Sequence, residues 1–237
     1  MTHVSYSNIG KRAINQDYIY PIDDKTDSNL FMVCDGVGSS PFGEVASKEV
    51  CEAADRFFTE RSYTRLSDIN FDALADYLRE SIAQVEATHP EVKGMSTTIV
   101  FIYFIEGGAA IAWMGDSRLY HIRQGEILYM TQDHSLINDL RKKGNTEVNE
   151  GRIRNFITRS MNSRTINDFS IHLIPGADIQ KGDYFFLCTD GVLENITDEI
   201  LARVLDTNEA ISIKADIIIS QCMDKTSDNF TFQLIQI

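Results

Sequence analysis

The chain has 237 residues, of which 43% are hydrophobic, so it can bury a sizeable core and lacks the composition of a disordered polypeptide. Its formal net charge is −13. Because phosphate backbones and anionic membranes attract basic faces, this charge argues against nucleic-acid and membrane partners.

The cysteines and the first residues bear on the cellular compartment. Cys34, Cys51, Cys188 and Cys222 form no Cys-x-x-Cys and no His/Cys cluster, which indicates buried free thiols in a reducing compartment. No signal peptide follows Met1, and the longest apolar run, at residues 99–105, is too short to span a bilayer. We therefore expect a soluble, cytoplasmic protein.

The first third of the chain predicts short strands followed by two helices. Pro41 suits the first turn of one helix, and Pro90 follows the end of the other. Each helix has one apolar stripe and one charged face, so each is expected to cover one side of a sheet. The expected elements are strands at 18–20 and 30–34 and helices at about 41–60 and 71–85.

Strand patterns dominate from Thr97 onward. Turn signals at residues 106–108 and 124–125 each separate two strand patterns, which predicts consecutive hairpins and hence an antiparallel sheet. The expected elements are strands at 97–105, 109–114, 117–123, 126–130, 170–174, 183–188 and 230–237, a short helix at 135–143 and a helical segment at about 197–223.

These patterns together predict an α+β fold. We expect an antiparallel β-sandwich flanked by α-helices, an αββα four-layer sandwich. Residues 144–164 are polar and poorly periodic, which is typical of a mobile surface excursion. No repeat, linker or low-complexity tract divides the chain, so we expect a single domain over residues 1–237.

Two strands end in the same acidic turn. The apolar residues before Asp35 and those before Asp190 are each followed by Asp-Gly-Val. Two isolated acids on rigid strand ends suggest a site for a hard cation, because Mg²⁺, Mn²⁺ and Ca²⁺ prefer carboxylate and carbonyl oxygens. The alternative is that each Asp only starts a turn.

Further acids occur at the ends of other strand patterns. If these strands pack in one core, their acids can converge at one edge. Four or five carboxylates cannot gather without cations, since mutual repulsion would protonate some of them. Two divalent ions would neutralise the cluster and activate a bridging water. The acids are Asp17, Asp35, Asp116, Asp190 and Asp228.

Several segments in this order resemble the metal-dependent Ser/Thr protein phosphatases (the PPM or type 2C family) in their compact bacterial form. They span nearly the whole chain, and together they are far more specific than any one alone. The segments are GKRAINQD (10–17), DGVG (35–38), GEVAS (43–47), GMSTT (94–98), GDSR (115–118), TQDHS (131–135), ITR (157–159), TDG (189–191) and DNFT (228–231).

The resemblance implies roles for individual positions. Asp35 would bridge two Mg²⁺ or Mn²⁺ ions, and the Gly36 carbonyl would bind one of them. Asp190 and Asp228 would complete the other. Asp17 would act through metal-bound water.

Two further roles follow from the same resemblance. Asp116 would help to hold a weaker third ion. Arg12 would bind the substrate phosphate, a task that suits its planar fork of donors.

Some positions depart from the better-known eukaryotic pattern. Gln16 stands where those enzymes have Glu, which would weaken binding of the second metal. Val37 replaces a His that is proposed there as a general acid. Ser39 replaces a frequent Gly.

The function implied is a Mg²⁺/Mn²⁺-dependent protein serine/threonine phosphatase in which a metal-bridging water attacks phosphorus. A catalytically silent relative that binds phosphoproteins or regulates a partner is the main alternative, and a small-molecule phosphohydrolase is another. The expected partners are phosphoproteins of a cognate Ser/Thr kinase, and the chain is expected to be a monomer.

Other candidates have competing explanations. His134 could be a catalytic base or could cap the helix from Ser135, and we favour the cap. Arg118, next to Asp116, is expected to be a structural ion-pair partner. The arginines of the excursion could recruit phosphopeptides or could simply be solvated. They are Arg152, Arg154, Arg159 and Arg164.

Overall fold

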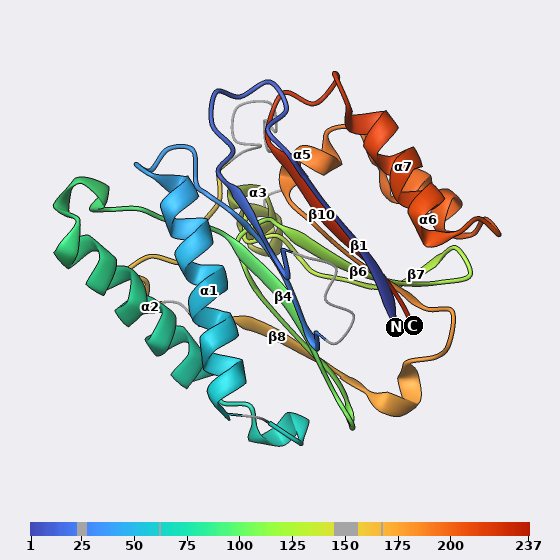
Figure 1. Cartoon of the computed structure of the whole chain (residues 1–237), viewed down its shortest axis with the longest axis horizontal. Helices are drawn as coiled ribbons and strands as arrows, with labels where there is room; N and C mark the ends of the chain where they lie inside the picture. Colours follow the sequence, from blue (N-terminus) through green and yellow to red (C-terminus); the bar gives the residue numbers. More distant parts are fainter. Residues whose placement is uncertain (23–27, 62, 145–155, 167) are drawn as a thin grey trace.

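The computed structural model describes residues 1–22, 28–61, 63–144, 156–166 and 168–237. Two five-stranded antiparallel sheets pack face to face, and helices cover the outer face of each sheet (Figure 1). Helices α1 and α2 lie on one side and α6 and α7 on the other, which makes four layers. The prediction of an antiparallel sandwich flanked by helices is therefore confirmed.

One sheet carries the first and last strands side by side, so the two chain ends lie together in Figure 1. The sequence analysis did not assign its edge strand β1, in which Val4 and Tyr6 supply the apolar contacts. The strand order is β1 (Thr2–Asn8), β10 (Phe230–Gln236), β9 (Tyr184–Cys188), β6 (Arg118–Arg123) and β7 (Glu126–Met130).

The other sheet contains the hairpin expected over residues 97–114, whereas the hairpin expected over residues 117–130 belongs to the first sheet. The core between the two sheets contains fully buried side chains such as Phe31, Ile111 and Phe185. The strand order is β2 (Asp17–Tyr20), β3 (Leu30–Asp35), β4 (Ile99–Ile105), β5 (Gly108–Met114) and β8 (Ser170–Pro175).

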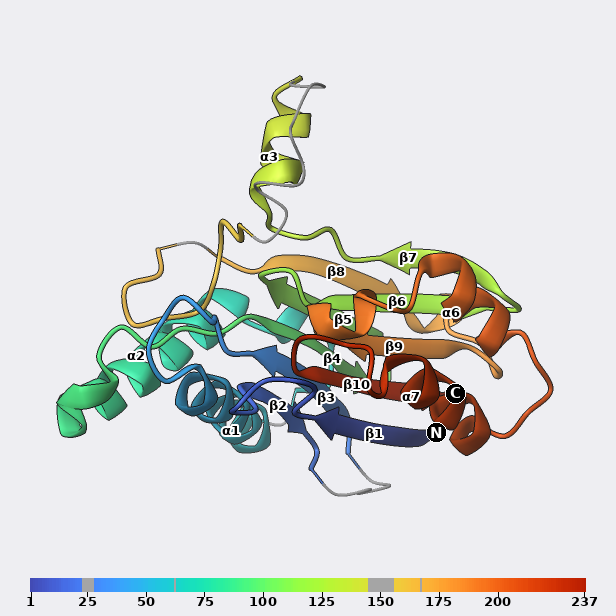
Figure 2. The ribbon, with the colours of Figure 1, turned by 90° about the horizontal axis from the view of Figure 1, so that it is seen from above.

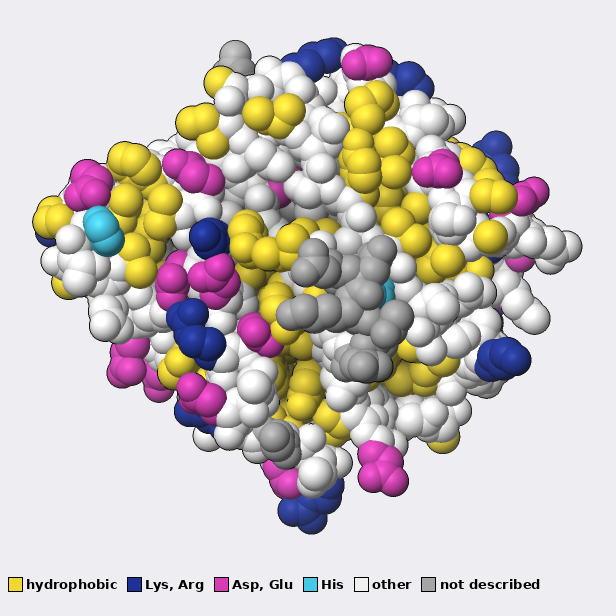
Figure 3. All heavy atoms as spheres, viewed as in Figure 1, with side chains coloured by type: hydrophobic (Ala, Val, Ile, Leu, Met, Phe, Trp, Pro, Cys, Tyr) yellow, Lys and Arg dark blue, Asp and Glu magenta, His cyan; other side chains and the backbone are white. Residues whose placement is uncertain are grey.

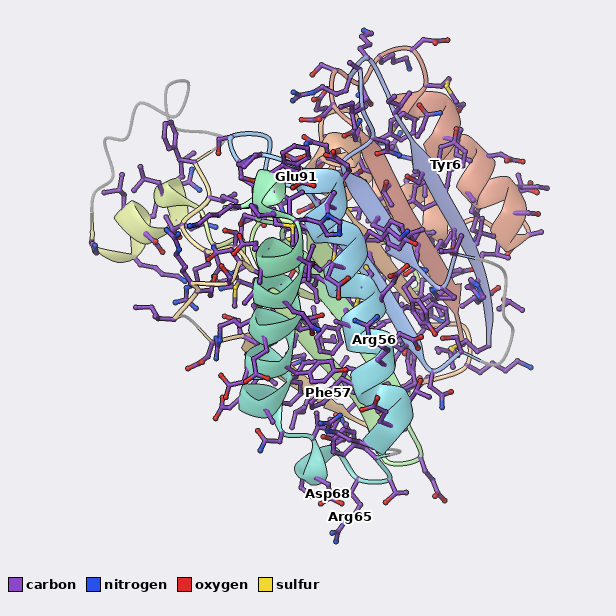
Figure 4. The ribbon with its side chains drawn as sticks, turned by 60° about the vertical axis from the view of Figure 1, so that its left-hand side comes forward. Tyr6, Arg56, Phe57, Arg65, Asp68 and Glu91 are labelled. Atoms are coloured by element: carbon purple, nitrogen blue, oxygen red, sulfur yellow. The ribbon has the colours of Figure 1, made fainter. Side chains whose placement is uncertain are left out.

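Helices α1 (Gly43–Arg61) and α2 (Phe71–Thr88) pack on this second sheet, close to their expected positions. Phe57 lies between the two helices (Figure 4), with its ring centroid 5.6 Å from that of Tyr77. The short helix η1 (Leu66–Asp68) connects them.

The helical segment expected over about 197–223 is two helices and not one. α6 (Asp198–Leu205) and α7 (Ile211–Cys222) are separated by the polar stretch 206–210. The buried Lys214 joins them, because its Nζ donates to the Leu205 carbonyl oxygen at 2.7 Å. All four cysteines are free and buried, as predicted.

The remaining described helices are short. In Figure 2, α3 (Leu136–Lys142) stands away from the sheets near β7 and β8. No helix in the described part of the chain is long and apolar enough to cross a membrane. The other short helices are η2 (Pro90–Val92), η3 (Gly176–Asp178) and α5 (Asp190–Leu193).

Candidate active site

Acidic residues from both sheets meet at one edge of the sandwich, where strands begin or end. Asp17 is the first residue of β2 and lies opposite Asp35, the last residue of β3. Asp116 lies in the turn between β5 and β6, Asp190 follows β9, and Asp228 precedes β10. The structure therefore brings together acids that are up to 211 positions apart in the sequence, from Asp17 to Asp228 (228 − 17).

A cavity of about 380 Å³ opens between these strand ends. Of the predicted site residues, only Asp17 does not line the cavity, and its side chain is buried. The residues that line it are Arg12, Asp35, Gly36, Asp116, Asp190 and Asp228.

The backbone of Asp35 is held on both sides by the segment before β4. The Asp35 carbonyl oxygen accepts from Thr98 N at 2.7 Å and from Thr97 Oγ1 at 2.9 Å. Asp35 N donates in turn to Thr98 Oγ1 at 3.0 Å. The next residue, Gly36, touches the start of α1 so closely that an added Cβ would lie 2.4 Å from the Gly43 carbonyl carbon. Only glycine fits there.

Asp17 is held by threonine hydroxyl groups. Its Oδ2 accepts from Thr189 Oγ1 at 2.9 Å, whereas its Oδ1 is buried with no hydrogen-bond partner among the described residues. Burial raises the pKa of Asp17 to about 7, and hydrogen bonds from Thr231 and Thr189 oppose this rise. A buried, unpartnered carboxylate oxygen is costly unless a proton or a cation satisfies it.

The lining carboxyl groups raise one another's pKa. Burial and then the charges of Asp17 and Asp190 raise the pKa of Asp35 well above its ordinary value. Burial and then Asp190 raise the pKa of Asp116 to about 7. For Asp190, burial and then Asp228 raise the pKa to about 6. The neighbouring Asp35 opposes this rise in the pKa of Asp190.

This donor set fits hard divalent cations, which bind carboxylate and carbonyl oxygens and would replace the protons that the raised pKa values favour. No three His, Cys, Asp or Glu side chains in the described part of the chain are already spaced to hold one ion. The acids therefore lie near one another, but no three of the described side chains are arranged around a single ion position. Arg12 contributes to this arrangement, because its guanidinium donates to Asp228 Oδ2 at 2.6 Å.

Asn229 fixes the loop that carries Arg12. Its Nδ2 donates to the carbonyl oxygens of Ile9 at 2.8 Å and Ile14 at 3.0 Å. Its Oδ1 accepts from Gln16 N at 2.8 Å. Asn229 was not among the predicted site residues, and its only signal in the sequence is its place in the segment DNFT (228–231).

Gln16 is anchored at its backbone and at one end of its amide. Its carbonyl oxygen accepts from Ser47 Oγ at 2.7 Å, and its Nε2 donates to Glu44 Oε2 at 3.1 Å. Because the donor end of the amide is engaged by Glu44, the acceptor Oε1 is the end left for the cavity that Gln16 lines. Glu44 was not among the predicted site residues, although it lies in the segment GEVAS (43–47).

The preference for His134 as a helix cap was wrong. Ser135 caps α3 with its own side chain, which accepts from Asn138 N. His134 Nδ1 instead accepts from Gly115 N at 3.1 Å, and its Nε2 lies 2.8 Å from Ser170 Oγ. Burial, and then the charge of Arg159, lowers the pKa of His134 to about 4. His134 thus supports the turn that carries Asp116.

The arginines near the site differ in what they contact. Arg118 makes a bidentate pair with Asp133, with both N–O distances at 2.7 Å, which confirms its expected ion-pair role. Arg152 and Arg154, with most of the expected excursion, lie outside the described residues. Arg159 and Arg164 are described, and neither lines the cavity.

Residues 4–216 match the sequence model of the family described as Protein phosphatase 2C. The chain belongs to the protein phosphatase 2C family. The match covers most of the chain and includes every predicted site residue except Asp228, which lies beyond its end.

Individual relatives cover nearly the full chain. The serine/threonine phosphatase Stp of Listeria monocytogenes serovar 1/2a is 25% identical over 95% of this chain and 91% of its own length. The crystal structure of the serine/threonine phosphatase Stp1 from Staphylococcus aureus superposes with a TM-score of 0.87 at 26% identity, covering 100% of this chain and 95% of that one.

A third relative bears on the metal. The structure of the catalytic domain of the phosphatase PstP, in complex with two manganese ions, has a TM-score of 0.77 at 26% identity and covers 98% of this chain and 96% of that one. A Mg²⁺ or Mn²⁺ cofactor is thus in keeping with both the protein phosphatase 2C family and the acidic cavity.

Proposed function

We propose that this chain is a Mg²⁺/Mn²⁺-dependent phosphatase that hydrolyses phosphoserine and phosphothreonine in proteins. The observation that carries the proposal is the cluster of acids with raised pKa around an open cavity that also contains Arg12. The charges of such a cluster repel one another near neutral pH, and bound cations would offset this repulsion. The relatives Stp, Stp1 and PstP are named as serine/threonine phosphatases.

Each acid has a place in this proposal. Asp35 and the Gly36 carbonyl would hold the first ion with Asp35 shared, and Asp190 and Asp228 would hold the second. Asp17, which does not line the cavity, would act through metal-bound water. Asp116 would help to hold a weaker third ion. The bound ions would supply a water of lowered pKa and neutralise charge on the phosphoryl group.

Arg12 would orient the substrate. Its guanidinium is half exposed at the cavity and can form two parallel hydrogen bonds to phosphate oxygens. The water oxygen bonds to phosphorus as the ester P–O bond breaks, and the departing serine or threonine oxygen takes up a proton. Val37 lines the cavity and has no proton to give, so that proton would come from water.

The proposal extends to the setting of the enzyme. Residues 1–237 would act as one phosphatase domain, as a monomer in the cytoplasm, on phosphoproteins made by a cognate Ser/Thr kinase. On the face shown in Figure 3, described Lys and Arg side chains lie scattered among Asp and Glu side chains and do not gather into one patch. With a net charge of −13, this supports a protein substrate over a nucleic acid.

Purified protein should release phosphate from a phosphothreonine peptide when Mn²⁺ or Mg²⁺ is added and should stop when a chelator is added. Asp35→Asn should abolish release, whereas Asp216→Asn, at an exposed position on α7, should leave it unchanged. Both variants should keep the far-UV circular dichroism of the parent. Metal-dependent binding of the phosphopeptide without turnover would favour the silent relative, and turnover by Asp35→Asn would remove the proposed mechanism.

A further inference from the structure

The lining of the cavity includes three apolar side chains, called here the apolar wall, in addition to its acids. Val37, Phe156 and Ile157 all line it. Phe156 has 60% of its surface exposed and is the most exposed phenylalanine among the described residues. Single exposed apolar residues are ordinary on protein surfaces. Phe156 differs because it borders a cavity together with two other apolar side chains.

The position of this apolar wall is fixed by backbone hydrogen bonds. The Phe156 carbonyl oxygen accepts from Leu136 N at 2.8 Å, and Thr158 N donates to the His134 carbonyl oxygen at 2.7 Å. A few residues on, Met161 exchanges two backbone hydrogen bonds with Thr97, at 2.7 and 3.0 Å.

These contacts fix the position of the apolar wall relative to Asp35. Met161 is fully buried, and Thr97 is the residue that also holds Asp35. The C-terminal part of the expected excursion is therefore tied to the sheet edge, more closely than its polar sequence suggested. Phe156 keeps 60% of its surface exposed at the cavity, so a ligand that enters the cavity can cover part of that surface.

We propose that Phe156 and Ile157 select protein substrates that have an apolar residue directly next to the phosphorylated serine or threonine. This inference rests on the proposed phosphatase function, since it needs the phosphate to lie over the carboxylates beside Arg12. Neighbouring residues of a peptide are about 3.8 Å apart at their Cα atoms, so the flanking side chain falls within reach of the cavity rim.

The chemistry of the cavity favours an apolar neighbour over a charged one. Covering Phe156 with an aliphatic side chain removes apolar surface from water on both partners. An acidic neighbour would leave that surface wet and would also be repelled by a protein of net charge −13. A preference of about fivefold to tenfold in kcat/KM is expected from one partly buried aliphatic side chain.

The test uses phosphothreonine peptides that differ only in the residue before or after the phosphothreonine, which is Leu, Asn or Asp. With Mn²⁺, the parent protein should hydrolyse a Leu peptide about fivefold to tenfold better than its Asn counterpart at one or both positions. Phe156→Ala should remove most of this preference, and Phe156→Leu should retain most of it. Ile213→Ala, which truncates an exposed residue on α7 remote from the cavity lining, is the matched control and should change nothing.

Free O-phosphoserine separates this inference from the proposed function. It has no flanking residue, so Phe156→Ala should lose less activity on it than on the Leu peptides. Metal-dependent hydrolysis with equal rates on Leu, Asn and Asp peptides would overturn the inference and leave the function standing. Equal loss of activity on free phosphoserine and on all peptides in Phe156→Ala would also overturn it. Absence of metal-dependent hydrolysis of any of these substrates by the parent would overturn the function and the inference together.

Discussion

Arg12 Nη2 donates to Asp228 Oδ2 at 2.6 Å, so the residue expected to bind phosphate is paired with an acid expected to bind metal. The pair is the largest cause of the raised pKa of Arg12. A cation that binds Asp228 at Oδ2 would compete with this guanidinium. Metal binding would therefore also free Arg12 for the substrate.

Arg12→Ala should shift metal and phosphate binding in opposite directions. Removing a half-exposed ion pair should tighten Mn²⁺ binding, by up to about fivefold, since such pairs contribute about 0–1 kcal/mol. The same change should lower kcat/KM by about one to two decades, because a charge-assisted contact of about 1.5–3 kcal/mol to the phosphate is lost. Titration calorimetry with Mn²⁺ alone gives the first number and steady-state kinetics the second. Arg12→Lys should be intermediate in both, and weaker Mn²⁺ binding by Arg12→Ala would contradict the competition.

The metal-free protein should lose stability as the pH rises. Asp17 and Asp116 have pKa values of about 7, and Asp190 about 6, against an ordinary value of 3.8. The native state therefore binds more protons than the unfolded state between about pH 4 and pH 7, and the free energy of unfolding falls across that window. Thermal unfolding with a chelator should give a lower Tm at about pH 8 than at about pH 5. Asp116→Asn should reduce this difference, and Asp216→Asn should not.

Mn²⁺ should stabilise the protein most at a pH at which these carboxyl groups would otherwise be ionised without a cation beside them. It should raise the Tm more at about pH 8 than at about pH 5, because at low pH the metal must displace protons. A metal-free Tm that rises steadily with pH would show that the carboxylates are not the dominant titrating groups.

His134→Ala should destabilise the protein without changing the shape of the pH–rate profile. His134 accepts from Gly115 N, and its truncation leaves a buried N–H without a partner, at a cost of about 1–3 kcal/mol. With a pKa of about 4, the ring is already neutral in the working range and has no titration there to lose. His134→Asn, which keeps an acceptor near Nδ1, should recover part of the stability. Loss of a limb of the pH–rate profile in His134→Ala would point to an acid–base role.

Glu44→Ala should weaken Mn²⁺ binding by a few-fold. Glu44 accepts from Gln16 Nε2, and without it the Gln16 amide is free to turn its oxygen away from the cavity. Glu60→Ala, at an exposed site near the end of the same helix, is the matched control. Calorimetry should show the loss in metal affinity with the Tm little changed. Identical affinities in the two variants would mean that Glu44 does not orient Gln16.

The sequence by itself determined the fold class and the sites where chemistry can occur. Strand and helix periodicities are local, so the hairpins after Thr97 and the helices α1 and α2 could be predicted nearly to their ends. Asp35 and Asp190 stood out because an acid cannot continue a buried apolar strand. The separation of α6 from α7 and the strand β1 were missed, since packing decides such short or weakly patterned segments.

Only the tertiary structure decided which of these residues face one another. The pairing of Arg12 with Asp228, the support of Gly115 by His134 and the orientation of Gln16 by Glu44 all join residues 19 or more positions apart. Such contacts depend on how two sheets stack and where their strands end, which no local pattern encodes. Burial decides the electrostatics in the same way. In the unfolded chain an Asp is charged and has an ordinary pKa. Its pKa rises only when folding removes the water around it and brings other carboxylates beside it.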